Sequence, residues 1–409
     1  MKKAFFFISL LGAAIISLGC LWDYDTLEME KQQFPGIEEL IAGKFLRHST
    51  EFYEWRIQDR QGKLAKDPNN LAYLDDLAVA YSKTHRDKEA IALMFKKEKI
   101  APGLYETYAN LGTFYIHDGQ YEKGLEYIDK AIAINPDAHF GREVYQRYLV
   151  EYVLEKRKSG VEGLPLNQYN KFGDNCINFY YFLYMKHSKN AEPGKNPFPK
   201  EELEKAIKGI SGMIKFGNSD SPILMEVLGD LLSSSNSRDA ARQLAAFAYY
   251  RASTAVASND SSSLEYYRII IRSALGQQVY NGQQGFFNEE KEVFFSNKSN
   301  FLKLKVIFDK SIEDGHAYFQ QIRQDEMAWI AAGEDPEQKF KEKYYDQISK
   351  TDSAFQIMPR PNRSVSPSTT PARKQPTPKQ SFPILPILLI AALVFGGLIF
   401  FIIKFSSKK

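Results

Sequence analysis

Two adjacent segments of the chain read LAYLDDLAVAYSKTHRDKEAIALMFKKEKIAP (residues 71–102) and YETYANLGTFYIHDGQYEKGLEYIDKAIAINP (residues 105–136). Pro68, Pro102 and Pro136 follow one another at intervals of 34 residues, so both segments share a 34-residue period. Aligned positions carry similar side chains: Leu77 with Leu111, Ala78 with Gly112, Tyr81 with Tyr115, and Met94 with Ile128. The spacing therefore predicts an internal repeat.

Each segment predicts two helices that pack against each other. Leu77, Ala78 and Tyr81 share one helical face, which we expect to be buried. Small residues such as Ala78 and Gly112 let two helices approach closely, while the tyrosines fill the space beside them. Gly119 is expected to end the first helix of its pair, and the closing prolines cannot continue the second helix.

The pattern resembles the tetratricopeptide repeat, in which large-x2-Leu-Gly-x2-Tyr is followed by Ala-x3-Phe and then Pro. The matching residues are Tyr108, Leu111, Gly112, Tyr115, Ala131 and Pro136 in the second segment, and Leu74, Leu77, Ala78, Tyr81, Ala90 and Pro102 in the first. The sequence departs from the family at Gly124, where Ala is usual, and at Lys97, which replaces a small residue. The resemblance implies an all-α fold, an α-solenoid of antiparallel helix pairs whose concave groove binds a protein or peptide.

Weaker repeats are predicted on both sides of these segments. Residues 139–156 predict another first helix with Tyr145, Leu149 and Tyr152 inward, and residues 49–65 predict a helix that caps the array. The stretch 222–253 repeats the pattern without its final proline, as Leu228, Gly229, Leu232, Ala241, Ala245 and Ala248.

The remaining signals in the body also favour helices and loops. Three prolines predict a loop at 188–199, residues 288–292 open a further helix, and residues 333–337 (GEDPE) end one helix and cap the next. We therefore expect an N-terminal helical cap (20–66), repeats similar to the tetratricopeptide family (67–157) and less regular helical repeats (158–357).

The N-terminus has the pattern of a secretory signal peptide over residues 1–19. Two lysines precede an apolar run, and Gly19 lies at the expected cleavage site. The segment resembles a bacterial lipoprotein signal with Cys20 as the lipidated residue, although Ser17 and Leu18 depart from that motif. Ordinary cleavage after Gly19 is the alternative.

The C-terminus predicts a linker and one transmembrane helix. Residues 358–382 are rich in Pro, Ser, Thr and basic residues, which is typical of an extended linker. Residues 383–403 carry no charge and, as a helix, roughly match a hydrocarbon core of about 30 Å. With a signal peptide before it and lysines in the tail (404–409), this helix predicts a single-pass membrane protein with an extracytoplasmic body and a cytoplasmic tail. Ala392 and Gly396 form a small-x-x-x-small pair that would suit a homodimer contact.

Charge and composition exclude several classes of function. Residues 20–357 contain all 50 acidic residues of the chain and have a net charge of about −7, which argues against nucleic acid as a partner. Cys20 and Cys176 are the only cysteines, so neither a disulfide framework nor a cysteine-based zinc site is expected.

No catalytic or cofactor motif is present in the sequence, so we expect no enzyme, cofactor or metal site. The six histidines share no ligand spacing and are expected at the surface or in turns. Asp75 and Asp76 are adjacent, so their side chains diverge on a helix, and a solvated face is the preferred interpretation. The aromatic run at 179–184 is expected to be core.

The groove hypothesis assigns a set of residues to the concave side of the array: Asp75, Val79, Ser82, Lys83, Ala109, Thr113, Ile116, His117, Glu143, Arg147 and Val150. Their mixed charge would suit a polar, partly charged peptide of unknown identity. A structural spacer of the cell envelope without a groove ligand, or an enzyme with a site in residues 164–347, are the alternatives.

Overall fold

The structure of the chain is a computed structural model. It describes residues 21, 23, 35–136, 138–161, 163–167, 178–187, 198–234, 239–275 and 298–346, all of which lie in the first of two compact units, Met1–Thr351 and Asp352–Lys409. Every regular element among these residues is a helix, and none is a strand. The prediction of an all-α body is confirmed.

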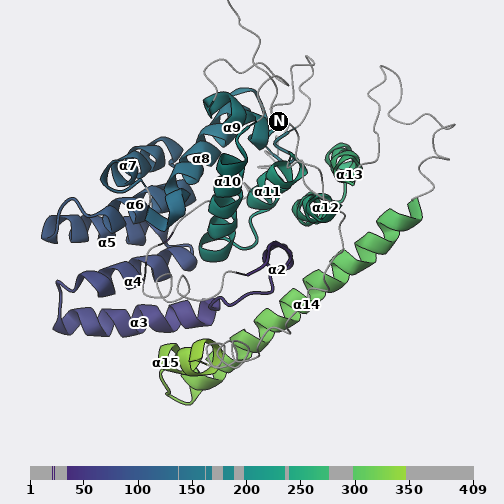
Figure 1. Ribbon diagram of the computed structural model, residues 1–409. Coiled ribbons are helices and arrows are strands. Elements are labelled where there is room, and N and C mark those ends of the chain that lie inside the picture. Colours follow the sequence, from purple (N-terminus) through teal and green to yellow (C-terminus); the bar gives the residue numbers. More distant parts are fainter. Residues whose placement is uncertain are drawn as a thin grey trace, which may run out of the picture. The chain divides into compact units, whose positions relative to one another are not determined.

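The helices follow one another through short turns over much of the unit (Figure 1). In chain order they are α2 (Ile37–Ala42), α3 (Thr50–Lys66), α4 (Leu71–Lys83), α5 (Asp87–Ile100), α6 (Tyr105–His117), α7 (Tyr121–Ile134), η1 (Ala138–Gly141), α8 (Arg142–Lys158), α9 (Phe179–His187), α10 (Lys200–Gly212), η2 (Met213–Gly217), α11 (Pro222–Ser234), α12 (Asp239–Ser253), α13 (Ser261–Ala274), α14 (Lys298–Ala331), α15 (Pro336–Phe340) and η4 (Lys341–Tyr345).

The helix ends are set by local chemistry, and two of them, at Gly119 and at Asp335, were expected from the sequence. The Ser49 hydroxyl accepts a hydrogen bond from the Phe52 amide and begins α3, and the Asn70 side chain does the same for α4. Gly119 follows α6 with a φ of 78°, a left-handed conformation that glycine adopts without strain. Asp335 caps α15 by accepting from two backbone amides just after Gly333, as the GEDPE stretch predicted.

The helices α6 and α7 cross at two glycines. A Cβ atom added to Gly112 would lie 2.6 Å from Ile128 Cγ1 and 3.1 Å from the Ile128 backbone nitrogen. A Cβ added to Gly124 would lie 2.6 Å from Ile116 Cγ1 and 3.0 Å from the Gly112 carbonyl oxygen. Glycine on both sides of the crossing therefore brings the backbones closer than alanine at position 124 would allow.

The first repeat uses a buried ion pair where the second has a small residue. The Lys97 ammonium donates to both carboxylate oxygens of Asp75, at 2.8 and 2.6 Å, and both side chains are buried. Asp76 is also buried and accepts from Arg60 at 2.9 Å. The expectation that these two aspartates face solvent is wrong, because each has a cation on a neighbouring helix.

The pair α11 and α12 packs with a different register. Gly229, which aligns with Gly112, lies under the ring of Tyr249, and an added Cβ would be 2.6 Å from two of its carbons. In α7, the residue that faces Gly112 is Ile128, and its aligned counterpart in α12 is Ala245. Tyr249, one turn after Ala245 in α12, thus fills the space beside Gly229 that Ile128 fills beside Gly112.

The long helix α14 returns to the first helices of the chain (Figure 1). It contacts α2, α3 and α15, and Phe308 stacks on Phe247 of α12 with ring centroids 4.5 Å apart. A Cβ added to Gly315 would overlap the carbonyl oxygen of Ala42 and lie 2.9 Å from its carbonyl carbon. Close backbone approach at Gly315 therefore seats α14 on the end of α2.

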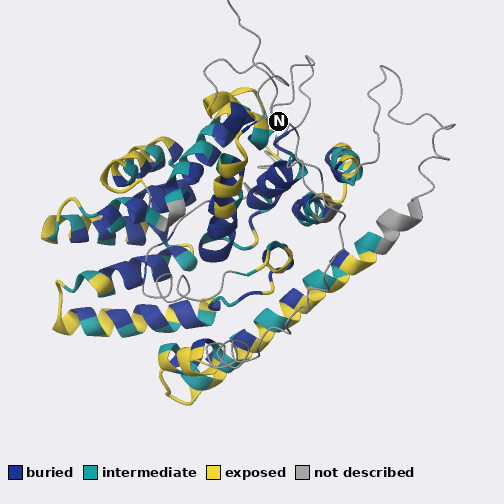
Figure 2. Ribbon diagram, in the orientation of Figure 1, coloured by how far each residue is buried: buried dark blue, intermediate teal, exposed yellow. Residues whose placement is uncertain are grey.

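The buried side chains form a continuous core through the middle helices (Figure 2). Phe179, Phe182, Leu183 and Tyr184 belong to it, so the expectation that the aromatic run at 179–184 is core is confirmed for these four residues, whereas Tyr180 is partly buried and Tyr181 is exposed. Several predicted features lie outside the described residues: the signal peptide, Cys20, Cys176, most of the loop 188–199, the helix start at 288–292, the linker, the span 383–403 and the Ala392/Gly396 pair. Within the described helices, none combines the length and apolar character that crossing a membrane requires.

Candidate functional site

The structure buries most of the residues assigned to the groove. Lys83 and Arg147 are partly exposed, and the others are buried: Asp75, Val79, Ser82, Ala109, Thr113, Ile116, His117, Glu143 and Val150. A peptide lying along the whole array would therefore not reach most of these side chains.

Later parts of the chain cover several of the residues that the groove hypothesis assigned to the concave side. Thr113 accepts a hydrogen bond from Gln146 of α8 at 3.2 Å, and Ile116 belongs to the core shared with α8 and α10. Gly209 of α10 in turn packs on Tyr145, since an added Cβ would lie 2.8 Å from its ring. Arg147 forms ion pairs with Asp129 and Glu151, at 2.8 and 3.2 Å.

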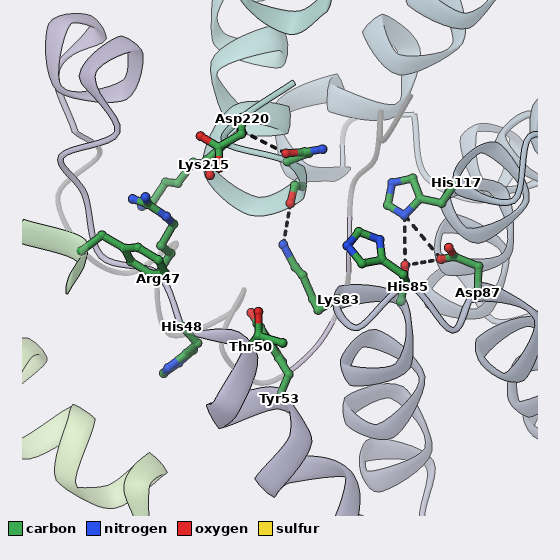
Figure 3. A pocket seen from close by; sticks show the side chains of 15 residues that line it. Arg47, His48, Thr50, Tyr53, Lys83, His85, Asp87, His117, Lys215 and Asp220 are labelled. Atoms are coloured by element: carbon green, nitrogen blue, oxygen red, sulfur yellow. Dashed lines mark hydrogen bonds and ion pairs between the residues drawn. The ribbon is translucent and has the colours of Figure 1, made fainter. Parts of the chain in front are cut away.

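Three of the predicted groove residues border a cavity of about 260 Å³ (Figure 3). They are Ser82, Lys83 and His117, and the remaining lining residues are Arg47, His48, Thr50, Tyr53, His85, Asp87, Lys215, Gly217, Asn218, Ser219, Asp220 and Phe319. Thr50, His85 and Asp220 are exposed, so the cavity opens to solvent on their side. It lies where the turn before α3, the end of α4, the end of η2 and α14 meet.

Lys83 connects the repeat array to the end of η2. Its ammonium donates to the carbonyl oxygens of Phe216 and Gly217, at 2.9 and 2.5 Å. Figure 3 shows the bond to Gly217. These carbonyls terminate the continuous helix formed by α10 and η2, where the helix dipole favours a cation. The contact fixes the ammonium group at the cavity wall.

Arg47 supplies a second cation to the wall. Its guanidinium donates to the Gly43 carbonyl at 2.6 Å and lies over the Phe319 ring, 4.0 Å from the centroid. No carboxylate of the described residues forms an ion pair with Arg47. Asp220 interacts with Arg47 electrostatically at longer range, but its ion pair is with Arg251, at 3.0 Å. Burial lowers the pKa of Arg47 below the ordinary value of a guanidinium group.

Ser82, Asp87 and His117 form a network that resembles a catalytic triad in composition only. The Ser82 hydroxyl donates to Asp87 at 2.5 Å and lies 2.9 Å from Nδ1 of His117, which is 3.6 Å from the same carboxylate. In a triad the hydroxyl and the carboxylate contact opposite ring nitrogens, so the imidazole can pass a proton between them. Here both face Nδ1, and the network instead connects the ends of α4 and α6 with the start of α5.

His48 joins the cavity to α14. It is buried, stacks on Phe52 with ring centroids 3.7 Å apart, and its Nδ1 is 2.6 Å from Glu326. Glu326 also accepts from the Ser49 amide at 2.9 Å. The expectation of surface or turn positions is wrong for His117, which is buried at the end of α6. His48 lies in the turn before α3 but is buried, and His85 is exposed in a turn with a φ of 61°.

A polar cluster continues this interface along α3. Glu337, just inside α15, accepts from Arg56 at 2.7 Å and from Arg60 at 2.6 Å. Both arginines are buried, and Arg56 also reaches Asp23 at 3.4 Å. The segment α14–α15 is therefore held on α3 largely by charged groups.

A second set of titratable groups is enclosed in the core. Glu226 accepts from Tyr267 at 2.5 Å and from the Asn167 amide at 3.2 Å, and Asp230 accepts from Tyr249 and from the Phe179 amide. Burial raises the pKa of both carboxyl groups. Asp230 begins α9 by satisfying its first amide, so we assign the pair a structural role.

Sequence reasoning missed Arg47, Lys215 and the role of α14 in this cavity. Arg47 lies in the turn before α3 and Lys215 in η2, and neither belongs to a periodic pattern. Within the described ranges, no group of His, Cys, Asp and Glu side chains is arranged to hold a metal ion. No family model, curated protein or solved structure matches the chain.

Proposed function

We propose that the chain is a membrane-anchored, extracytoplasmic helical-repeat scaffold that binds a segment of a partner protein at the cavity beside Lys83. The observation that carries this proposal is that the inner side of the array opens at this cavity, whereas Thr113, Glu143 and Val150 are covered by the chain itself. The 34-residue phase and the close crossing at Gly112 support a tetratricopeptide-like solenoid.

The scaffold is tested by charge reversal at the cavity. We expect Lys83→Glu together with Lys215→Glu to remove partners that co-purify with the full chain from detergent extracts of its native cells. Arg147→Glu is the matched control, because Arg147 was also assigned to the groove but lies outside the cavity lining. Equal recovery of partners by all three proteins would favour the spacer alternative.

Membrane anchoring is tested separately. Deleting residues 383–403 should release the body into the soluble fraction if Cys20 carries no lipid. If Cys20 is lipidated, release should require Cys20→Ala as well. A full-length chain that fractionates as a soluble protein would contradict the anchor.

A further inference from the structure

We propose that the cavity is a binding site for one small oxyanion group, a phosphate or a carboxylate, with Arg47, Lys83 and Lys215 as its cationic ligands. The inference rests on the proposed function, because it names the chemistry that a partner would present to this cavity. The proposed site does not include the outer surface of the repeats.

The charge of the lining favours an anion. Arg47, Lys83 and Lys215 contribute three positive charges, and among the described lining residues the acidic ones are Asp87 and Asp220. Asp87 accepts a hydrogen bond from Ser82, and Asp220 is already paired with Arg251, which does not line the cavity. The described lining therefore holds an excess of positive charge.

The surroundings of the cations also favour an anion. Arg47 lies on the Phe319 ring, and no carboxylate in the described part of the chain is in ion-pair contact with it. A partly buried cation is costly unless an anion approaches it. Lys83 is fixed by two carbonyls at the end of η2, so its ammonium is already positioned. Binding an oxyanion would then require little reordering of either side chain.

The size of the cavity limits the ligand to a single group. A volume of about 260 Å³ lies below the usual range for sites that enclose a whole drug-sized ligand, about 300–1,000 Å³. A phosphate or carboxylate group fits this space. The rest of the molecule that carries this group would extend into solvent past the exposed residues Thr50 and His85. The site would thus bind one charged group of a larger molecule.

The test is titration of the purified full chain in detergent with inorganic phosphate and, in a separate arm, with acetate, followed by calorimetry at low ionic strength. We expect one saturable site for at least one of these anions and an affinity at least about tenfold weaker in Arg47→Gln, since bonds to charged groups contribute strongly. Arg147→Gln is the control and should bind as the unmodified chain does. The arm that saturates identifies the group.

Thermal melting separates loss of binding from loss of folding. Without added anion, the melting temperature of Arg47→Gln gives the baseline of the variant, which lacks the hydrogen bond to Gly43 and the contact with the Phe319 ring. The saturating anion should raise the melting temperature of the unmodified chain but not of the variant. If Arg47→Gln is unstable, Lys215→Gln replaces it in both measurements.

Two results would overturn the proposal: no saturable binding of either anion, or equal affinities for the unmodified chain and the cavity variants. Neither result would contradict the scaffold proposal, because the charge reversal of Lys83 and Lys215 could still remove a co-purifying partner protein. Conversely, anion binding without any co-purifying partner would contradict the scaffold and leave the oxyanion site standing.

Discussion

Replacing glycine by alanine should have opposite effects at Gly112 and Gly62. Gly112 lies at the crossing of α6 and α7, where an added Cβ meets Ile128 Cγ1 at 2.6 Å. Gly62 lies on the exposed side of α3, and an added Cβ meets nothing within 4 Å. Both positions are inside helices, so both substitutions gain the same helix propensity, about 1 kcal/mol.

The difference between the two variants isolates the steric cost of the crossing. Ile128 is fully buried and β-branched, so its side chain cannot easily rotate away from a new methyl group. The backbone nitrogen of Ile128 at 3.1 Å and the Gly124 carbonyl at 3.2 Å also resist, and the helices must separate by a few tenths of an ångström. Overpacking of this kind costs about 1–3 kcal/mol.

We therefore expect Gly62→Ala to stabilise the chain by about 0.5–1 kcal/mol and Gly112→Ala to be about 1–3 kcal/mol less stable than Gly62→Ala. Urea unfolding followed by circular dichroism measures this difference, and an unchanged slope would show that the unfolded states are comparable. Gly112→Leu should be worse than Gly112→Ala, with exposed Glu122→Gln nearly silent. Equal midpoints for the two alanine variants would refute close helix packing at the 34-residue phase.

Three further predictions concern buried charge and the C-terminal helix. Lys97→Met should cost about 3–5 kcal/mol by leaving Asp75 buried alone, and adding Asp75→Asn should recover part of the loss in urea unfolding; a double variant no better than the single one would contradict the pairing. Because burial raises the pKa of Glu226, the folded state holds its proton at pH values where the unfolded chain has lost it, so stability should fall as the pH rises above the ordinary value of 4.5. The free energy of unfolding of the unmodified chain should be lower at pH 8 than at pH 5.5, and this difference should be smaller in Glu226→Gln. An equal difference in both proteins would contradict burial of the carboxyl group. Gly315→Ala should loosen α14 from α2 and speed proteolysis within residues 298–346, whereas unchanged cleavage would argue against the close contact with Ala42.

The sequence was informative where structure is decided by neighbours along the chain. Helix boundaries near Ser49, Gly119 and Asp335 follow from caps and turns that operate within a few residues. The face of α4 that contains Leu77 follows from helical periodicity, and the structure buries it. These features needed no knowledge of distant contacts.

The candidate site could not be predicted in the same way, because it depends on segments far apart in the sequence. Lys83 and His117 were placed on the inner side of the array, but nothing local indicated that η2 and α14 would meet them there. Periodicity also gave no reason to pair Asp75 with Lys97, since charged residues inside a helix are ordinarily solvated. Burial of such residues is favourable only when a partner on another helix pairs with them. The periodic pattern of one helix does not identify that partner.

The contacts between α3 and the end of the described body also govern the order in which the molecule can fold. Ser49 and Glu326 are separated by 277 positions, and Arg56 and Glu337 by 281. Closing a loop of that length costs about 5 kcal/mol of chain entropy, whereas each helix pair closes over a few tens of residues. During synthesis from the N-terminus, the helix pairs can form as they emerge, but Arg56 and His48 must wait for the last helices. The packing of α3 is thus completed last.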